Sequence, residues 1–177
     1  MRVFALCLCL VTATVISCNR VSNTANPSVL KASDYVTDDA KVIDDATKKQ
    51  LETTLAALKE RTKIDFSVVT VKTTGDKSAF DYSLELARAR KDKSFEQNVS
   101  GLLLLIAVDD RTWHIQITRN LEVQLTKEIL TNLSVPMSDS FKQNRYSEGI
   151  LKYVNAIIAR LEPQKAQKTQ KIVNHQC

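Results

Sequence analysis

The sequence predicts a single-domain α/β protein, a three-layer α/β/α sandwich around a mixed central sheet. The clearest signal is an unbroken apolar run, Leu102–Val108, which is typical of a strand covered on both faces. A short polar turn joins this run to an alternating segment, 113–118, and together they predict an antiparallel β-hairpin. Amphipathic helical patterns precede and follow the hairpin, and they can supply the outer layers.

The first half of the domain predicts a helix, a strand and a second helix. Asp44 or Asp45 can cap a helix whose inner face carries three leucines: Leu51, Leu55 and Leu58. Residues 64–71 alternate and are rich in β-branched side chains, as in a strand. Ser78 and Asp81 resemble a capping box. They begin a helix with a predicted inner stripe of Phe80, Leu84 and Ala87.

After the hairpin the sequence predicts three helical segments. The first surrounds Leu125–Leu133 and is expected to stop before Pro136, because proline disfavours the helical conformation of its predecessor. A short helical piece holds Phe141. A long final helix carries an apolar stripe of Ile150, Val154, Ile157 and Leu161.

Composition limits the class of protein. The chain has 177 residues, of which 44% are hydrophobic and only three are glycine, so it can build one core but no glycine-rich phosphate loop. All 20 acidic residues lie between Asp34 and Glu162, with 19 of the 25 lysines and arginines, so the net charge of +5 comes from the two ends. Without a basic stripe on the domain, nucleic acid is not an expected partner.

The N-terminal segment predicts export and lipid anchoring. Val3–Val15 is too short to span a bilayer, and the sequence Val15-Ile16-Ser17-Cys18 resembles a bacterial lipobox. The resemblance implies cleavage before Cys18, which then carries the acyl chains. The alternative is an ordinary secretory signal cleaved near Ala13 or Ser17. We expect residues 1–17 to be the signal, 18–33 a flexible tether, 34–162 the domain and 163–177 a disordered Lys/Gln tail.

This organisation predicts a lipid-anchored protein of the cell envelope that faces the periplasm. Asn19 follows the lipobox cysteine, where aspartate would signal inner-membrane retention, so the outer membrane is favoured. Cys7 and Cys9 leave with the signal, and Cys177 is the last residue, so the mature domain has no cysteine pair for a disulfide or a zinc site. The oligomeric state stays open.

Carboxylates are the main candidates for chemistry. Two histidines without a G-x-S-x-G motif do not make a serine hydrolase triad, and His114 is expected to be a packing or surface residue. Asp38 precedes the first helix, while Asp109 and Asp110 occupy the hairpin turn. If these loops meet, their oxygens could bind calcium, which prefers oxygen ligands. Aspartate also suits turns and helix caps for local reasons, so that alternative stays open.

Several segments in order resemble the TPM domain, a family that includes a thylakoid-lumen photosystem-repair protein and many bacterial membrane-linked proteins. The segments are Val36–Asp38, Val42–Asp44, Leu58–Thr62, Phe66–Val71, Gly101–Ala107, Asp109–Arg111, Leu121–Glu122, Leu125–Thr126, Pro136, Phe141–Lys142, Tyr146 and Gly149–Ile150. The resemblance covers about residues 34 to 162 and implies an α/β/α sandwich. It also implies calcium binding in some members and a phosphatase label for part of the family.

The chain departs from the family pattern at three places. Ala89–Lys93 stands where the family usually has a Trp and an Ile-Gly pair, Thr118 and Asn120 replace glycines, and Lys127 replaces an acidic residue. Glycine lets a backbone approach a phosphate closely, so these replacements weaken the expectation that this chain shares a catalytic activity with the family.

Three functions follow from these observations. The first is a membrane-tethered lipoprotein that binds calcium or a protein partner and assists assembly or maintenance of membrane complexes. The second is a metal-assisted phosphatase acting on phosphomonoesters, in which Asp38, Asp109 and Asp110 hold the ion, Asp109 and Asp110 form the catalytic centre, and Arg111 counters developing charge. The third is a purely structural adaptor.

Overall fold

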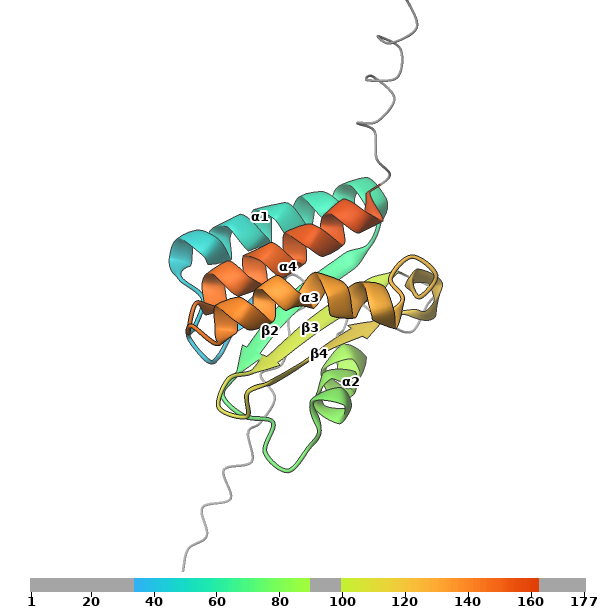
Figure 1. The fold of residues 1–177 in the computed structure, drawn as a ribbon. Coiled ribbons are helices and arrows are strands. Elements are labelled where there is room, and N and C mark those ends of the chain that lie inside the picture. Colours follow the sequence, from blue (N-terminus) through green and yellow to red (C-terminus); the bar gives the residue numbers. More distant parts are fainter. Residues whose placement is uncertain (1–33, 90–99, 163–177) are drawn as a thin grey trace, which may run out of the picture.

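In the part of the chain that the structure describes, four strands form one mixed sheet in the order β1-β2-β3-β4 (Figure 1). The structure, a computed structural model, describes residues 34–89 and 100–162. The strands are β1 (Val36–Asp38), β2 (Asp65–Val71), β3 (Gly101–Ala107) and β4 (Thr112–Ile117). The first three are parallel, and β4 runs antiparallel to β3. The predicted mixed sheet and hairpin are confirmed, whereas the three-residue β1 was not predicted.

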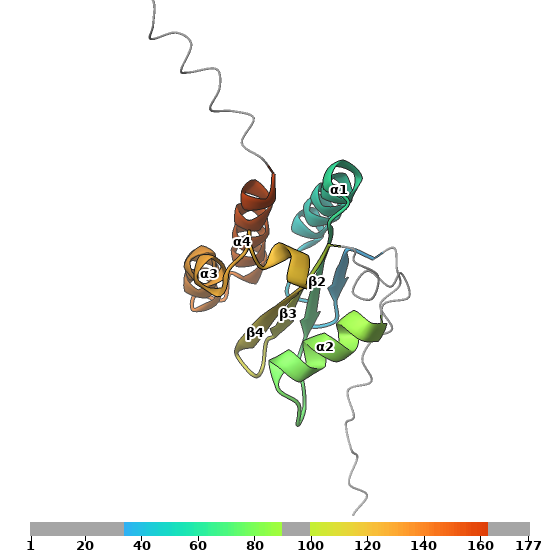
Figure 2. The ribbon, with the colours of Figure 1, turned by 90° about the vertical axis from the view of Figure 1, so that its right-hand side faces the viewer.

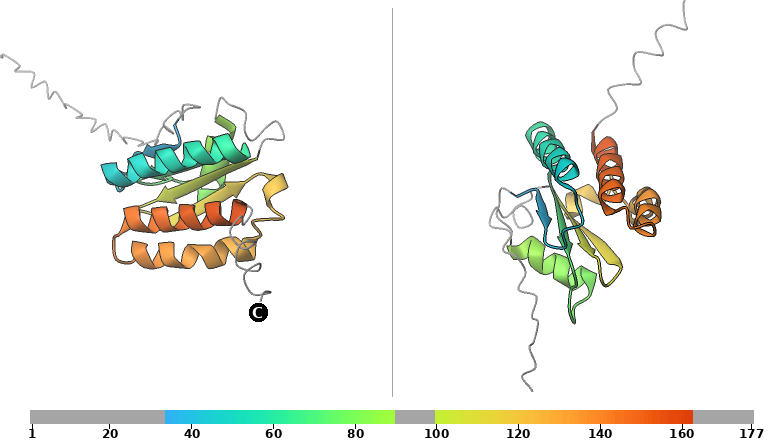
Figure 3. Two further views of the ribbon diagram at one scale, coloured as in Figure 1. Left: turned by 90° about the horizontal axis from the view of Figure 1, so that it is seen from above. Right: turned by 90° about the vertical axis from the view of Figure 1, so that its left-hand side faces the viewer.

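Helices cover both faces of the sheet, which confirms the predicted three layers. The helices α1 (Asp45–Thr62), α3 (Lys127–Phe141) and α4 (Tyr146–Leu161) lie on one face, and α2 (Ala79–Ala89) lies on the other (Figure 2). Seen from above, α4 lies between α1 and α3 (Figure 3). A short 3-10 turn, η1 (Arg119–Leu121), joins the sheet to α3.

Alternation along β3 divides the core in two. Leu102, Leu104 and Ile106 pack with α1, α3 and α4. The three leucines predicted to form the inner face of α1 are fully buried in this part of the core. Leu103, Leu105 and Ala107 point to the other face and pack with α2. Every residue of β2 and β3 is buried, so helices must cover both faces of these two strands.

The two parallel crossovers leave the sheet in opposite directions. Because β1, β2 and β3 are adjacent in that order, while α1 and α2 lie on opposite faces, one crossover is right-handed and the other is left-handed. Nearly all such crossovers in proteins are right-handed. The chain therefore diverges after β1 and β2, and the carboxyl ends of diverging parallel strands are where open α/β sheets usually bind ligands.

Two sequence predictions about helices are wrong in detail. The predicted stop before Pro136 does not occur, since α3 continues through it to Phe141. Pro136 and Asn132 are both exposed, so water can bond the carbonyl of Asn132 that loses its helical donor. In α2 the buried residues are Tyr82, Ser83, Leu86 and Ala87, whereas Phe80 is 49% exposed.

The buried face of α2 is determined by where the helix begins. Its Ser78–Asp81 cap is confirmed, because the Asp81 N–H donates to Ser78 Oγ at 3.1 Å. This cap starts the helix at a phase that turns Tyr82 and Leu86, one turn apart, onto the sheet. Phe80 is left half-exposed and meets the His114 ring of β4 edge-on, with 5.3 Å between the ring centroids.

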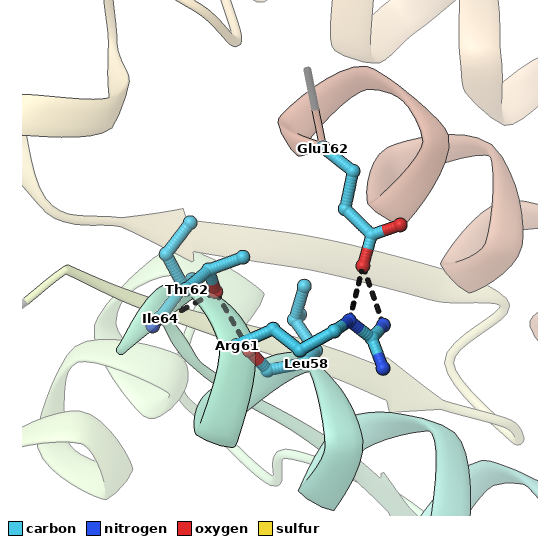
Figure 4. Close-up of polar contacts among 5 residues, drawn as sticks. All are labelled: Leu58, Arg61, Thr62, Ile64 and Glu162. Carbon is cyan, nitrogen blue, oxygen red and sulfur yellow. Dashed lines mark hydrogen bonds and ion pairs between the residues drawn. The ribbon is translucent and has the colours of Figure 1, made fainter. Parts of the chain in front are cut away.

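At the opposite end of the sheet, the ends of α1 and α4 are tied together (Figure 4). Arg61 donates to Glu162 from its Nε at 3.0 Å and from a second guanidinium nitrogen. Thr62 donates to the Leu58 carbonyl at 2.7 Å and accepts from the Ile64 N–H at 3.2 Å, so one hydroxyl satisfies two groups where α1 ends. These contacts fix the turn that leads from α1 into β2.

The predicted signal, tether and tail fall outside the described residues. Within 34–89 and 100–162, none of the helices has the length and apolar character that crossing a bilayer requires.

Replacing Gly149 by alanine should lower the free energy of unfolding by about 1–3 kcal/mol, the usual cost of overpacking. A Cβ at this position would lie 2.9 Å from Phe141 Cε1 and 3.0 Å from the Met137 carbonyl oxygen, so α4 packs directly against α3 here. Urea denaturation measures the change. Asn155→Ala, at an exposed position of the same helix, is the control and should change the value by less than about 0.5 kcal/mol. Equal stability of the two variants would contradict this close packing.

Candidate functional site

Four connections meet at the carboxyl end of the parallel strands: 39–44, 72–78, 108–111 and 142–145. Asp44 caps α1 by accepting from the Thr47 N–H at 2.8 Å, and its own N–H donates to Ser147 Oγ at 2.9 Å. Donation from the Thr47 N–H, followed by the Ser147 and Thr47 hydroxyls, lowers the pKa of the Asp44 carboxyl to about 2. The two acidic stretches of the sequence therefore lie at the same end of the sheet, on either side of β2.

Asp38 closes the loop that leads into α1. Its two carboxylate oxygens accept from the N–H groups of Val42 at 3.1 Å and Ile43 at 3.0 Å. The buried Thr70 hydroxyl donates to the same carboxylate. Asp38 therefore satisfies backbone donors that would otherwise lack partners at a tight turn, which is a structural role.

Asp110 ties the hairpin to the loop after β2. It accepts from the Thr74 N–H at 2.7 Å, the Thr73 hydroxyl at 2.8 Å and the Thr74 hydroxyl at 3.1 Å. Donation from the Thr74 N–H, followed by the Thr73 hydroxyl, lowers the pKa of Asp110 below its ordinary value. Both of its carboxylate oxygens are thus engaged.

Asp109 and Arg111 differ from Asp110 in having no side-chain partner within the described residues. The backbone N–H of Asp109 donates to the Lys72 carbonyl at 2.8 Å, and its carboxylate is exposed. Arg111 has a φ of 52°, in the left-handed region that non-glycine residues seldom adopt. Its side chain lines a cavity described below.

The three predicted metal ligands are not gathered in one cluster within the described part of the chain. Strands β1 and β3 flank β2, so their backbones lie about 9–10 Å apart. Asp38 is in register with Thr70, whereas Asp109 bonds two residues further along, at Lys72. Calcium ligands lie about 2.3–2.6 Å from the ion, hence within about 5 Å of each other. Among residues 34–89 and 100–162, no three His, Cys, Asp or Glu side chains gather as a metal site. Calcium binding stays a prediction from sequence.

A cavity of about 510 Å³ lies between the hairpin and the turn that joins α3 to α4. Its lining has an apolar part and two cations but no carboxylate; the residues are Ile106, Ala107, Val108, Arg111, Thr112, Trp113, Ser138, Phe141, Lys142, Asn144 and Tyr146. Lys142 pairs with Asp139 at 2.9 Å. Asn144, like Arg111, has a positive φ, of 56°. Such backbone strain concentrates at functional sites.

A groove of about 700 Å³ continues from Trp113 along β4. Its lining combines apolar side chains with polar and charged ones; the residues are Trp113, His114, Ile115, Ile117, Glu122, Leu125, Thr126, Lys127, Leu130 and Thr131. Trp113 lines both the groove and the cavity, so the two are neighbours between β4 and α3.

The outer edge of β4 forms one side of this groove. The Thr118 N–H donates to the Gly101 carbonyl at 3.0 Å, which makes this a hydrogen-bonded antiparallel pair. Alternation from that pair directs the backbone groups of Trp113, Ile115 and Ile117 away from β3. Since β4 is the last strand of the described sheet, these groups have no strand partner there.

Sequence reasoning missed this edge, although a signal was present. The segment Thr112–Ile117 contains no Lys, Glu, Asp or Pro, the residues with which proteins usually protect an exposed strand edge. His114, for which the sequence predicted a packing or surface role, packs on Phe80, and burial lowers its pKa.

Comparison with known proteins agrees with the fold. The model of the TPM domain family matches residues 36–160. The N-terminal domain of a protein from P. gingivalis has a similar structure, with a TM-score of 0.66 and 27% identity over 73% of this chain and 83% of that one. The BA42 protein from Bizionia argentinensis is similar in fold, with a TM-score of 0.57 and 16% identity over 67% of this chain and 81% of that one. A comparison with curated proteins gave no match.

Asp110→Ala should lower the melting temperature, and Asp109→Ala should not. Loss of the three hydrogen bonds should cost about 1 kcal/mol at pH 7, less than a buried carboxylate would give because this one is exposed. The folded pKa of Asp110 is depressed, so its contribution is complete above the ordinary aspartate pKa of about 4 and declines as pH falls below it. Thermal melts of both variants at pH 7 and at pH 2.5 test this. A gap from wild type that widens on acidification would contradict the assignment.

Proposed function

Because this chain belongs to the TPM domain family, we propose that it acts as a lipid-anchored TPM domain that binds an extended segment of a protein partner. In this role it would assist the assembly or maintenance of membrane complexes in the cell envelope. The observation that carries the proposal is the unprotected edge of β4 beside an apolar groove.

The edge suits strand addition. An extended peptide placed along β4 can bond the outward backbone groups of Trp113, Ile115 and Ile117, and these bonds need no particular sequence. The side chains of the same three residues line the groove. Alternate side chains of the peptide would pack between them and Leu130, which supplies sequence preference. Backbone pairing and apolar packing would thus act together.

The anchor explains how such a site would meet membrane complexes. Several acyl chains on Cys18 give stable attachment, whereas a single chain binds only marginally. The 15 residues between Cys18 and Asp34 can reach at most about 50 Å when extended. The domain would therefore work close to the membrane surface.

The geometry gives the phosphatase alternative less support. Asp110 is engaged by Thr73 and Thr74, and Asp38 by the loop before α1. Asp109 and Arg111 remain available, but they lack a gathered set of metal-binding carboxylates in the described part of the chain. We therefore place the partner-binding function first.

Cys18→Ser should move the protein from the membrane fraction to the soluble fraction of cells, because the serine hydroxyl does not accept the lipid. Fractionation, together with metabolic labelling by a fatty acid, measures this. Ser17→Ala, which keeps a small residue before the cysteine, is the control and should remain labelled and membrane-bound. Persistent membrane association of unlabelled Cys18→Ser would contradict lipid anchoring.

Ile115→Pro should remove partner binding at the β4 edge. It deletes an outward N–H that is not part of the β3–β4 ladder, and proline is tolerated at such edge positions. A photoreactive side chain at Lys127, which lines the groove, should cross-link a membrane-complex subunit in intact cells, and Ile115→Pro should reduce this product at least fivefold. Ile115→Val, which keeps the N–H, should retain it.

A second variant tests the same site without the risk that proline disturbs the fold. Thr131→Trp would fill the groove from an exposed position of α3 without touching the ladder, and it should reduce the same product. A photoreactive residue at Asp81, on α2, serves as the control for nonspecific capture. Equal cross-linking from Asp81, or a product insensitive to both variants, would refute the groove as the partner site.

A further inference from the structure

We infer that the partner segment is the C-terminal end of a protein, bound antiparallel to β4 with its free carboxylate at Arg111 and Lys142. This inference rests on the proposed function, because it assigns direction and chemistry to the peptide in the groove. It follows from the positions of the groove, which runs along the edge of β4, and of the cationic cavity, which lies beside the Thr112 end of the same strand.

The arrangement of β4 and α3 relates the direction of a bound peptide to the position of the cavity. The strand runs from Thr112 to Ile117, and α3 passes over it in the opposite sense, so that Leu130 and Thr131 line the groove and Ser138 and Lys142 line the cavity. A peptide antiparallel to β4 enters beside Ile117 and leaves beside Thr112. Its last residue then reaches the mouth of the cavity.

The cavity is positively charged. Arg111 and Lys142 line the cavity, and none of the other lining residues carries a charge. The Arg111 guanidinium has no hydrogen-bond or ion-pair partner in the described part of the chain. Lys142 already pairs with Asp139, so Arg111 is the stronger candidate. An unpaired guanidinium beside a concave site suits a carboxylate, to which it can donate two parallel hydrogen bonds.

The size and the walls of the cavity indicate what else it can hold. A cavity of about 510 Å³ exceeds what a lone carboxylate requires, and its walls include Trp113, Phe141 and Tyr146. The ring centroids of Phe141 and Tyr146 lie 4.9 Å apart, so two aromatic rings pack together in the lining of the cavity. The cavity therefore accommodates the last side chain of the peptide as well, and an apolar or aromatic one suits these walls.

Two random hexapeptide libraries test the inference: they are identical except that one ends in a free carboxylate and the other in a carboxamide. The protein is the full chain in detergent, and Trp113, the only tryptophan, reports binding by its fluorescence. The free-acid library should yield peptides that bind saturably, and amidation of a selected peptide should weaken binding at least tenfold. Binding should also weaken as salt is raised.

Arg111→Gln should reproduce the effect of amidation, with at least tenfold weaker binding of the free acid and unchanged binding of the amide. The backbone conformation at 111 is equally strained with glutamine, so this variant removes only the charge and the two donors. Lys142→Gln should have a smaller effect. Arg119→Gln, at an exposed arginine that lines neither the cavity nor the groove, is the matched control and should bind as wild type does.

The outcomes separate this inference from the proposed function. If Ile115→Pro abolishes binding but acid and amide peptides bind equally, the β4 edge binds internal segments and the carboxylate assignment fails alone. If no peptide from either library binds, the inference fails, and cross-linking in cells decides the proposed function. Dimerisation of the chain that Ile115→Pro abolishes would assign the edge to a second copy and overturn the inference.

Discussion

The structure depends on the complete burial of β2 and β3. A strand with apolar side chains on both sides requires a cover on both faces, and each fully buried leucine of β3 contributes roughly 1.5–3 kcal/mol relative to exposure. One layer of helices is therefore insufficient. This requirement places α2 opposite α1, α3 and α4, although the consequence is one crossover of the rare hand.

The same requirement determines where polar groups gather. Helices leave on opposite faces after β1 and β2, so the loops at the carboxyl end of the sheet must turn sharply. Asp38, Asp44 and Asp110 each supply acceptors to backbone N–H groups exposed by those turns. An acidic sequence at this end is therefore explained by turn geometry before any ligand is invoked. Chemistry that remains available lies with the side chains that no turn uses, above all that of Arg111.

The sequence predicts most of the fold because its strongest patterns are local. The apolar run of β3, the leucines of α1 and the Ser78 cap each specify an element without reference to the others. Elements whose existence depends on tertiary context were not predictable in this way. Strand β1 has only three residues and pairs with β2 alone, while the passage of α3 through Pro136 depends on which side of the helix faces solvent.

The candidate site was less predictable for the same reason. Spacing along the chain shows that Asp109 follows a strand, but it does not show that Asp110 reaches Thr73 and Thr74 across the loop after β2. Whether a strand lies at the edge of a sheet also depends on the whole strand order. Only then does the lack of charge and proline in Thr112–Ile117 become meaningful.

An exposed strand edge gives only weak affinity by itself, and the proposed anchor would compensate by holding the domain near its partners. Three outward residues offer few backbone hydrogen bonds, each worth about 0.5–1.5 kcal/mol net, whereas association costs about 4–15 kcal/mol in lost freedom. Confinement within about 50 Å of a membrane raises the effective concentration of both partners and offsets part of that cost. The unprotected edge also risks pairing with the wrong strands. A groove and an arginine at one end of it would restrict pairing to peptides of one direction, so selectivity would come from the surroundings of β4 while the strand itself stays permissive.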